Sequence, residues 1–173
     1  ENPNNIKLIC QDIANHYKQN FDGKFKGLIV TASRKACVRF KKMIDHYLPP
    51  EYSEVVMTFD KDDEEINEYA RELTGKYKIK DLEEITKTII ENYKKKEYPK
   101  LLIVTDMLIT GFDEPKLGVL YLFKPLKDHR LLQTISRVNR PYKEKHAGLV
   151  VDYAGIFKYI EKALSIYRDE DIE

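Results

Sequence analysis

Three polar side chains in the C-terminal part of the chain could together hold phosphate groups. In the segment 131–140, with the sequence LLQTISRVNR, Gln133, Arg137 and Arg140 stand at i, i+4 and i+7 and share one face if the segment is a helix. Guanidinium groups stay charged and present a rigid fork of donors that matches phosphate oxygens. The spacing therefore predicts a phosphate-binding stripe, although an ordinary solvated helix face carries arginines too.

A second candidate element lies upstream of this stripe. The run 101–104 is short and continuously apolar, which is typical of a strand buried on both faces of a parallel sheet. Ligands of open α/β sheets bind beyond the carboxyl ends of strands, where Thr105 and Asp106 follow this run. Gly111 would allow a tight turn near a ligand, and Asp113 could accept hydrogen bonds from a ribose. Taken alone, the segment could equally be a strand and a turn without function.

Apolar periodicity predicts the elements that position these residues. The predicted helices are 5–20, 33–47, 82–93, 129–140 (after Asp128 as N-cap) and 156–167, and the predicted strands are 27–31, 54–59, 101–105, 119–123 and 149–151. Strands that alternate with helices indicate an α/β fold, with a mainly parallel sheet and helices on both faces. The acidic run 60–65 lacks the glycine and distal glutamate of an EF-hand, so we expect a solvated loop entering a helix, and no metal site.

The two segments together resemble motifs V and VI of superfamily 2 helicases and translocases. Residues 101–157 are similar in detail to the motor (R) subunit of type I restriction enzymes, through TGFDEP, YLFKPLKDH, ISRVNRPY and GLVVDYAGI. KGLIVTASRKACVRFKKMI resembles motif IV, near 27–40, and the less similar region 60–98 is expected to hold an insertion. The resemblance implies one helicase C-terminal, three-layer RecA-like (P-loop NTPase-like) domain over 1–173, with motif V at 101–115 and motif VI at 131–140.

The resemblance also implies roles in ATP hydrolysis. Arg140 is the expected arginine finger on the γ-phosphate and Arg137 a second phosphate ligand, and the two could exchange these roles. Asp113 is expected near the ribose, and Gly111 to supply the turn that couples nucleotide and DNA. Gln133 would orient the arginines or a water molecule.

Motif IV supplies candidates for the DNA path. Thr31 and Ser33 follow the first predicted strand, where hydroxyls and a helix N-terminus can hold a backbone phosphate. The resemblance assigns this region and Thr105 to the DNA track, and Arg34 could contact phosphate. Ser33 could equally serve only as the N-cap of its helix, because one hydroxyl can do only one of these well. In motif VI, Ser136 stands directly before the first arginine, at a position where many relatives carry glycine or alanine.

Other motor and nuclease motifs are missing from the sequence. It has no G-x-x-x-x-G-K-[ST] loop, no Asp-Glu pair after a buried strand and no strand-borne nuclease carboxylates. The resemblance implies ATP and Mg²⁺ for the full-length protein, with Mg²⁺ held by the first motor domain and no cofactor bound tightly to this chain. The chain alone is therefore predicted to be inactive.

Composition limits the partners of the chain. A net charge of +1 provides no overall basic field, so contacts with DNA must be local. Two cysteines, Cys10 and Cys37, are too few for a disulfide framework and fit a cytoplasmic location. Neither a membrane-spanning run nor a signal peptide is present, so no membrane contact is expected. The opening ENPNN lacks an initiator methionine, and we expect an excised fragment.

The expected function is that of the second motor domain of an ATP-dependent double-stranded DNA translocase in a type I restriction endonuclease. Expected partners are double-stranded DNA, the first RecA-like domain and the nuclease domain of the same subunit, and the modification and specificity subunits. One alternative is another superfamily 2 DNA or RNA helicase, against which GLVVDYAGIF argues. The other is a non-catalytic module that binds DNA or a partner protein, against which Arg137, Arg140 and Asp113 argue.

Overall fold

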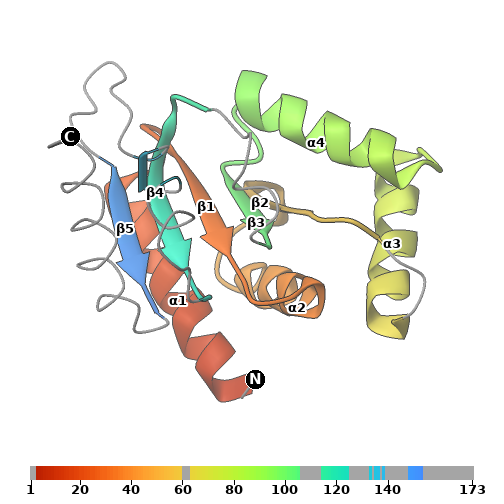
Figure 1. The fold of residues 1–173 in the computed structure, drawn as a ribbon, viewed down its shortest axis with the longest axis horizontal. Helices are drawn as coiled ribbons and strands as arrows, with labels where there is room; N and C mark the ends of the chain where they lie inside the picture. Colours follow the sequence, from red (N-terminus) through yellow and green to blue (C-terminus); the bar gives the residue numbers. More distant parts are fainter. Residues whose placement is uncertain are drawn as a thin grey trace, which may run out of the picture.

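The chain alternates helices and strands through most of its length (Figure 1). The computed structural model describes residues 3–59, 63–105, 114–124, 133, 135, 136, 138 and 148–153. The elements are α1 (Pro3–Asn20), β1 (Lys26–Val30), α2 (Arg34–Ile44), a 3-10 turn (Pro50–Tyr52), β2 (Ser53–Val56), α3 (Glu64–Tyr77), α4 (Leu82–Lys95), β3 (Leu101–Val104), β4 (Leu117–Leu122) and β5 (Leu149–Asp152). None of the helices in these ranges is both long enough and apolar enough to cross a membrane.

The five strands form one parallel sheet in the order β2-β3-β1-β4-β5. β1 lies in the centre, where Ile29 is opposite Ile103 on one side and Tyr121 on the other. Every residue of β1, β3 and β4 is buried, as expected of parallel strands that are covered on both faces. The predicted parallel α/β architecture is thus confirmed.

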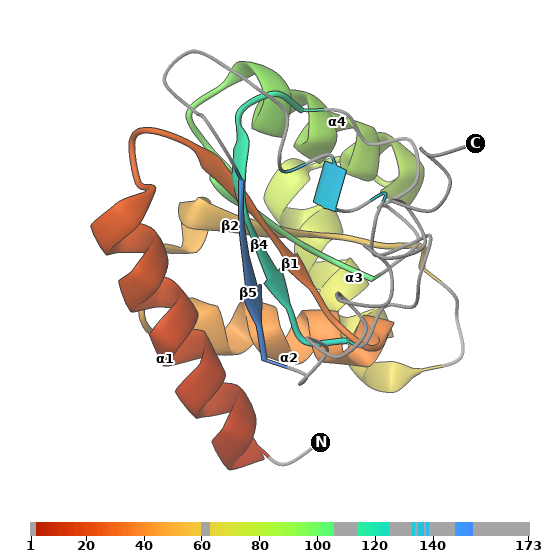
Figure 2. The same cartoon turned by 60° about the vertical axis from the view of Figure 1, so that its left-hand side comes forward.

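Helices cover both faces of this sheet, and Figure 2 shows α1 and α4 on opposite sides of it. On one face, His16 of α1 lies with Nδ1 2.7 Å from the hydroxyl of Tyr121 in β4. On the other face, the hydroxyl of Tyr93 in α4 donates to the carbonyl of Gly27 in β1 (3.0 Å). The core of the domain therefore consists of two layers, one on each side of the sheet.

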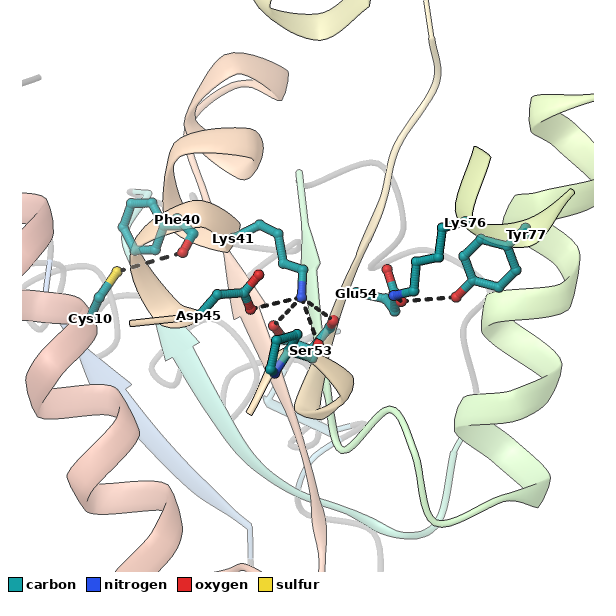
Figure 3. Close-up of polar contacts among 9 residues, drawn as sticks. Cys10, Phe40, Lys41, Asp45, Ser53, Glu54, Lys76 and Tyr77 are labelled. Atoms are coloured by element: carbon teal, nitrogen blue, oxygen red, sulfur yellow. Dashed lines mark hydrogen bonds and ion pairs between the residues drawn. The ribbon is translucent and has the colours of Figure 1, made fainter. Parts of the chain in front are cut away.

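Two buried polar contacts fasten β2 between α2 and α3 (Figure 3). Lys41 of α2 donates to the carboxylate of Asp45 (2.8 Å) and to the carbonyl of Ser53 in β2 (2.7 Å). The next residue, Glu54, is 3% exposed and accepts from Lys76 of α3. These contacts hold β2 to α2 through Lys41 and to α3 through Glu54.

The largest differences between the observed and the predicted boundaries lie in three places. The strand predicted at 54–59 ends at Val56, and the helix predicted to reach about 47 ends at Ile44 and continues as turns. The whole of α3 lies in the region 60–80, where the sequence predicted only a helix after an acidic loop. Asp63 is its N-cap and accepts from the amides of residues 65 and 66 (2.9 and 3.2 Å). The predicted helix 156–167 lies outside the described residues.

Candidate functional site

The carboxyl ends of three neighbouring strands meet at one edge of the sheet. Val104 of β3 is paired with Val30 of β1 and with Val56 of β2, so the three strands end in line. Thr31 and Thr105 therefore follow adjacent strand ends, and the amide of Thr31 donates to the carbonyl of Val104 (2.8 Å). The structure thus brings the two residues predicted from motifs IV and V to the same edge.

The side chain of Thr31 is engaged within the protein. The residue is fully buried, and Oγ1 lies 3.1 Å from the carbonyl oxygen of Ser33, 3.3 Å from that of Val104 and 3.0 Å from Sγ of Cys37. A direct bond to a phosphate would have to break these contacts. The geometry instead makes Thr31 a link between the turn before α2 and the end of β3.

Ser33 is the N-cap of α2. Its backbone is extended (φ −156°, ψ 164°), and Oγ accepts from the amide of Ala36 (3.1 Å). The N-cap alternative is therefore confirmed. A serine hydroxyl also carries a proton to donate, and Ser33 is exposed, so the cap leaves that proton available to a ligand. Capping and phosphate contact are compatible here, in contrast to the expectation that one hydroxyl serves only one of them.

Arg34 and Thr105 lie at the same edge and are partly exposed. Nη1 of Arg34 lies 3.4 Å from the carbonyl oxygen of Thr58, just after β2, so the guanidinium spans the ends of two elements. Thr58 also lines a cavity of about 680 Å³, which sequence reasoning did not foresee. The charged residues of its lining balance, with two lysines, one aspartate and one glutamate, so this cavity adds no net positive charge to the edge.

Motif VI is described at four positions. Gln133 and Ser136 are exposed, Ile135 is half-buried and Val138 is 1% exposed, which agrees with the predicted amphipathic helix. The hydroxyl of Ser136 donates to the carbonyl of Gln133 (2.8 Å), as a side chain within a helical turn can.

The remaining predicted nucleotide contacts are outside the described part of the chain. These are Arg137, Arg140, Gly111 and Asp113. Within the described ranges, no group of three or more histidine, cysteine, aspartate or glutamate residues is placed to hold a metal ion. The described part of the candidate site therefore consists of the edge at Thr31, Ser33, Arg34 and Thr105, together with four residues of motif VI.

Comparison with known families identifies the domain. A family model described as type I restriction enzyme subunit R domain 3 matches residues 50–155, which is more than half of the chain. The chain belongs to this family. The chain is 43% identical over 177 residues to the putative type I restriction enzyme MjaVIIP endonuclease subunit of Methanocaldococcus jannaschii. That match covers 96% of this chain and 16% of the relative, so the chain spans about a sixth of the relative's length.

Solved structures show that the R subunit domain has the RecA-like fold of helicase C-terminal domains. The C-terminal domain of the DEAD-box protein Dbp5 superposes with a TM-score of 0.57 at 13% identity, over 93% of this chain and 79% of that one. S. cerevisiae Dbp5 bound to RNA and ADP BeF3 gives a TM-score of 0.56 at 13% identity, over 98% of this chain and 37% of that one.

Proposed function

We propose that this R subunit domain is the second motor domain of an ATP-dependent double-stranded DNA translocase within a type I restriction endonuclease. The observation that carries the proposal is the alignment of the ends of β1 and β3, which brings Thr31 and Thr105 to one edge in a member of this family. Ligands of open parallel sheets bind at this edge. The fold is shared with Dbp5, which has been solved bound to RNA and ADP BeF3.

In this proposal the motif VI helix serves ATP hydrolysis. Arg140 reaches the γ-phosphate of ATP held by the first motor domain, and Arg137 is a second phosphate ligand, with either arginine able to be the principal finger. Asp113 binds the ribose, Gly111 supplies the turn beside it, and Gln133 orients the arginines or a water. An arginine finger accelerates phosphoryl transfer by about three to five orders of magnitude.

The carboxyl edge of the sheet serves the DNA track. The proton of the Ser33 hydroxyl and the amide groups at the start of α2 donate to a backbone phosphate, and Arg34 adds a positive charge. Thr105 contacts the next part of the backbone. Thr31 positions the turn from within, because its hydroxyl is bonded inside the protein. Closure of the cleft on ATP and its opening after hydrolysis would then shift this edge along DNA.

The other components of the motor would come from the rest of the complex. ATP and Mg²⁺ would be held by the first RecA-like domain, and DNA would be cut by the nuclease domain of the same subunit. The modification and specificity subunits complete the assembly. Cys10 and Cys37 are both buried thiols rather than halves of a disulfide, which supports a cytoplasmic location.

The decisive experiment measures ATP turnover by the full-length R subunit with DNA and its partner subunits. Arg140→Ala or Arg137→Ala should lower turnover by about 10³–10⁵-fold while nucleotide binding is retained. Arg71→Ala is the matched control, because Arg71 is an exposed arginine on α3, far along the chain from motif VI. Unchanged turnover in both motif VI variants would exclude an arginine finger here and favour a domain that only binds DNA or a partner protein.

A further inference from the structure

Lysines stand at the amino ends of three neighbouring strands. Lys26 is the first residue of β1, Lys100 immediately precedes β3, and Lys116 immediately precedes β4. These strands are neighbours in the order β3-β1-β4 and run parallel, so the three lysines lie at one edge of the sheet. This edge is opposite to the one with Thr31 and Thr105, and it takes no part in the nucleotide or DNA contacts proposed above.

A cavity of about 360 Å³ opens at this edge, and we call it the lysine recess. Six of its ten lining residues are lysines, namely Lys24, Lys26, Lys95, Lys96, Lys100 and Lys116, and the one carboxylate among them is that of Glu97. Tyr17 and Phe25 contribute aromatic surface. The volume falls within the range of about 300–1,000 Å³ that is usual for small-molecule sites.

Two of the six lysines form the fixed inner part of the recess. Lys26 is 7% exposed and donates to the three backbone carbonyls of Lys96, Glu97 and Pro99 (2.6, 3.1 and 2.6 Å), which uses all its donors. Lys100 pairs with Asp22 and lies 3.6 Å from the carboxylate of Glu97. These two ammonium groups contribute charge but are already bonded.

The lysines of the rim remain able to bond a ligand. Lys24 and Lys96 are exposed, and neither forms an ion pair with any residue that the structure describes. Lys116 is half-exposed, and its ammonium lies 3.3 Å from the carbonyl of Lys94. Lys95 and Lys96 lie at the C-terminus of α4, where the helix dipole favours positive charge. Lys24 and Lys116 come from other segments, so this dipole does not explain why they stand at the same cavity.

Lysines outnumber carboxylates in the lining of the recess by six to one, although Lys95 and Lys100 are paired with Glu91 and Asp22 beyond it. Burial, and then repulsion by the neighbouring ammonium of Lys116, lowers the pKa of Lys26 from 10.5 to about 8. Since the whole chain carries a net charge of only +1, six lysines around one cavity are a local concentration. A bound anion would relieve the repulsion among these groups.

We propose that the lysine recess binds phosphate groups, either those of a free phosphate ester or those of the DNA backbone. A phosphate group offers several strong acceptor oxygens and more than one charge, which match several ammonium donors arranged around a cavity better than a single carboxylate does. The proposal does not depend on the arginine finger, because the two sites lie at opposite edges of the sheet.

The first probe is inorganic triphosphate, and its affinity for this chain is measured by isothermal titration calorimetry. The test variant is Lys24→Ala/Lys96→Ala, and the control is Lys7→Ala/Lys42→Ala, which removes two exposed lysines that do not line the recess. We expect wild type and control to bind equally and the test variant to bind about tenfold more weakly. Absence of binding by the wild type, or equal losses in both variants, would overturn the proposal, with circular dichroism confirming that each variant is folded.

A short DNA duplex is the second probe, and it distinguishes the source of the phosphate. If the recess binds the DNA backbone, the test variant should lower DNA affinity and reduce the slope of log K against log salt concentration by about 2, since each lost contact is worth about 0.9. If the recess binds a free ester, triphosphate binding should weaken while DNA binding stays equal to that of the control.

Discussion

At the scale of single residues, Lys41 shows how a buried charge holds the fold. Its side chain is 7% exposed and bonds the Asp45 carboxylate, two backbone carbonyls and the Ser53 hydroxyl. Lys41→Met would leave these acceptors without their donor, so we expect the free energy of unfolding to fall by about 3 kcal/mol in urea denaturation. Lys42→Met is the control, because Lys42 is exposed, and it should change stability by less than about 0.5 kcal/mol. Equal effects of the two variants would contradict the structural role of Lys41.

Ser33 allows the cap and the phosphate contact to be separated. Ser33→Ala removes the acceptor for the Ala36 amide and should cost about 1 kcal/mol in thermal or urea unfolding. Ser33→Asp keeps an N-cap acceptor but places a negative charge where a phosphate would bind. We therefore expect Ser33→Asp to retain stability and to weaken DNA binding of the full complex, as measured by fluorescence anisotropy. If Ser33→Ala loses stability but binds DNA normally, and Ser33→Asp also binds DNA normally, Ser33 serves only as an N-cap.

At the scale of elements, Gly148 controls how closely β5 approaches the motif VI helix. A Cβ at Gly148 would lie 2.1 Å from Cγ1 of Val138 and 2.2 Å from its carbonyl oxygen, so Gly148→Ala must displace Val138, which follows Arg137 in the sequence. We expect this variant to lower ATP turnover of the full-length subunit at least about tenfold, without contact to the nucleotide. Gly75→Ala is the control, since nothing lies within 4 Å of a Cβ at this helical position, and it should leave turnover unchanged. Normal turnover in Gly148→Ala would mean that the helix tolerates the shift.

The elements that the sequence predicted well share a strong local signal. β1 and β3 are continuous apolar runs, and Ser33 is a good N-cap residue just before α2, so these three elements lie within a few residues of where the sequence predicted them. The bounds of α3 were not predicted, because only Ile66, Tyr69 and Leu73 form its buried side and most of its other residues are charged or polar. The end of β2 was missed because an apolar run continues beyond Val56, and pairing with β3 decides where the strand stops.

At the scale of the whole molecule, the order of the strands in the sheet could not be predicted from the sequence. Thr31 and Thr105 are far apart in sequence, and only the pairing of β1 with β3 places them together. The pairing of β1 with β3 and with β4 gathers Lys26, Lys100 and Lys116 at the opposite edge, although in the sequence each of them only stands at the start of an apolar run. Burial of the Thr31 hydroxyl also depends on this packing, so its internal bonds were not predictable from residue type.

The stability of the whole fold at alkaline pH depends on its buried and half-buried tyrosines. The pKa is raised mainly by burial or by a bonded carboxylate at seven of them, Tyr17, Tyr52, Tyr69, Tyr77, Tyr93, Tyr121 and Tyr153. Above the ordinary tyrosine pKa of 10.0, the unfolded chain loses these protons while the folded chain keeps them. The folded state then binds more protons, so the contribution of these tyrosines to stability is complete below pH 10 and is lost as pH rises above it.

Lys26 acts in the opposite sense, because its lowered pKa of about 8 adds stability as pH rises from 8 to 10.5. Seven tyrosines outweigh one lysine, so we expect cooperative alkaline unfolding above pH 10, with tyrosinate absorbance and far-ultraviolet circular dichroism changing together. The chain unfolded in guanidinium is the control, and its tyrosines should titrate near pH 10 in a single step. Ionisation of these tyrosines before any loss of helix signal would contradict the prediction, because the folded core would then contain charged tyrosinates.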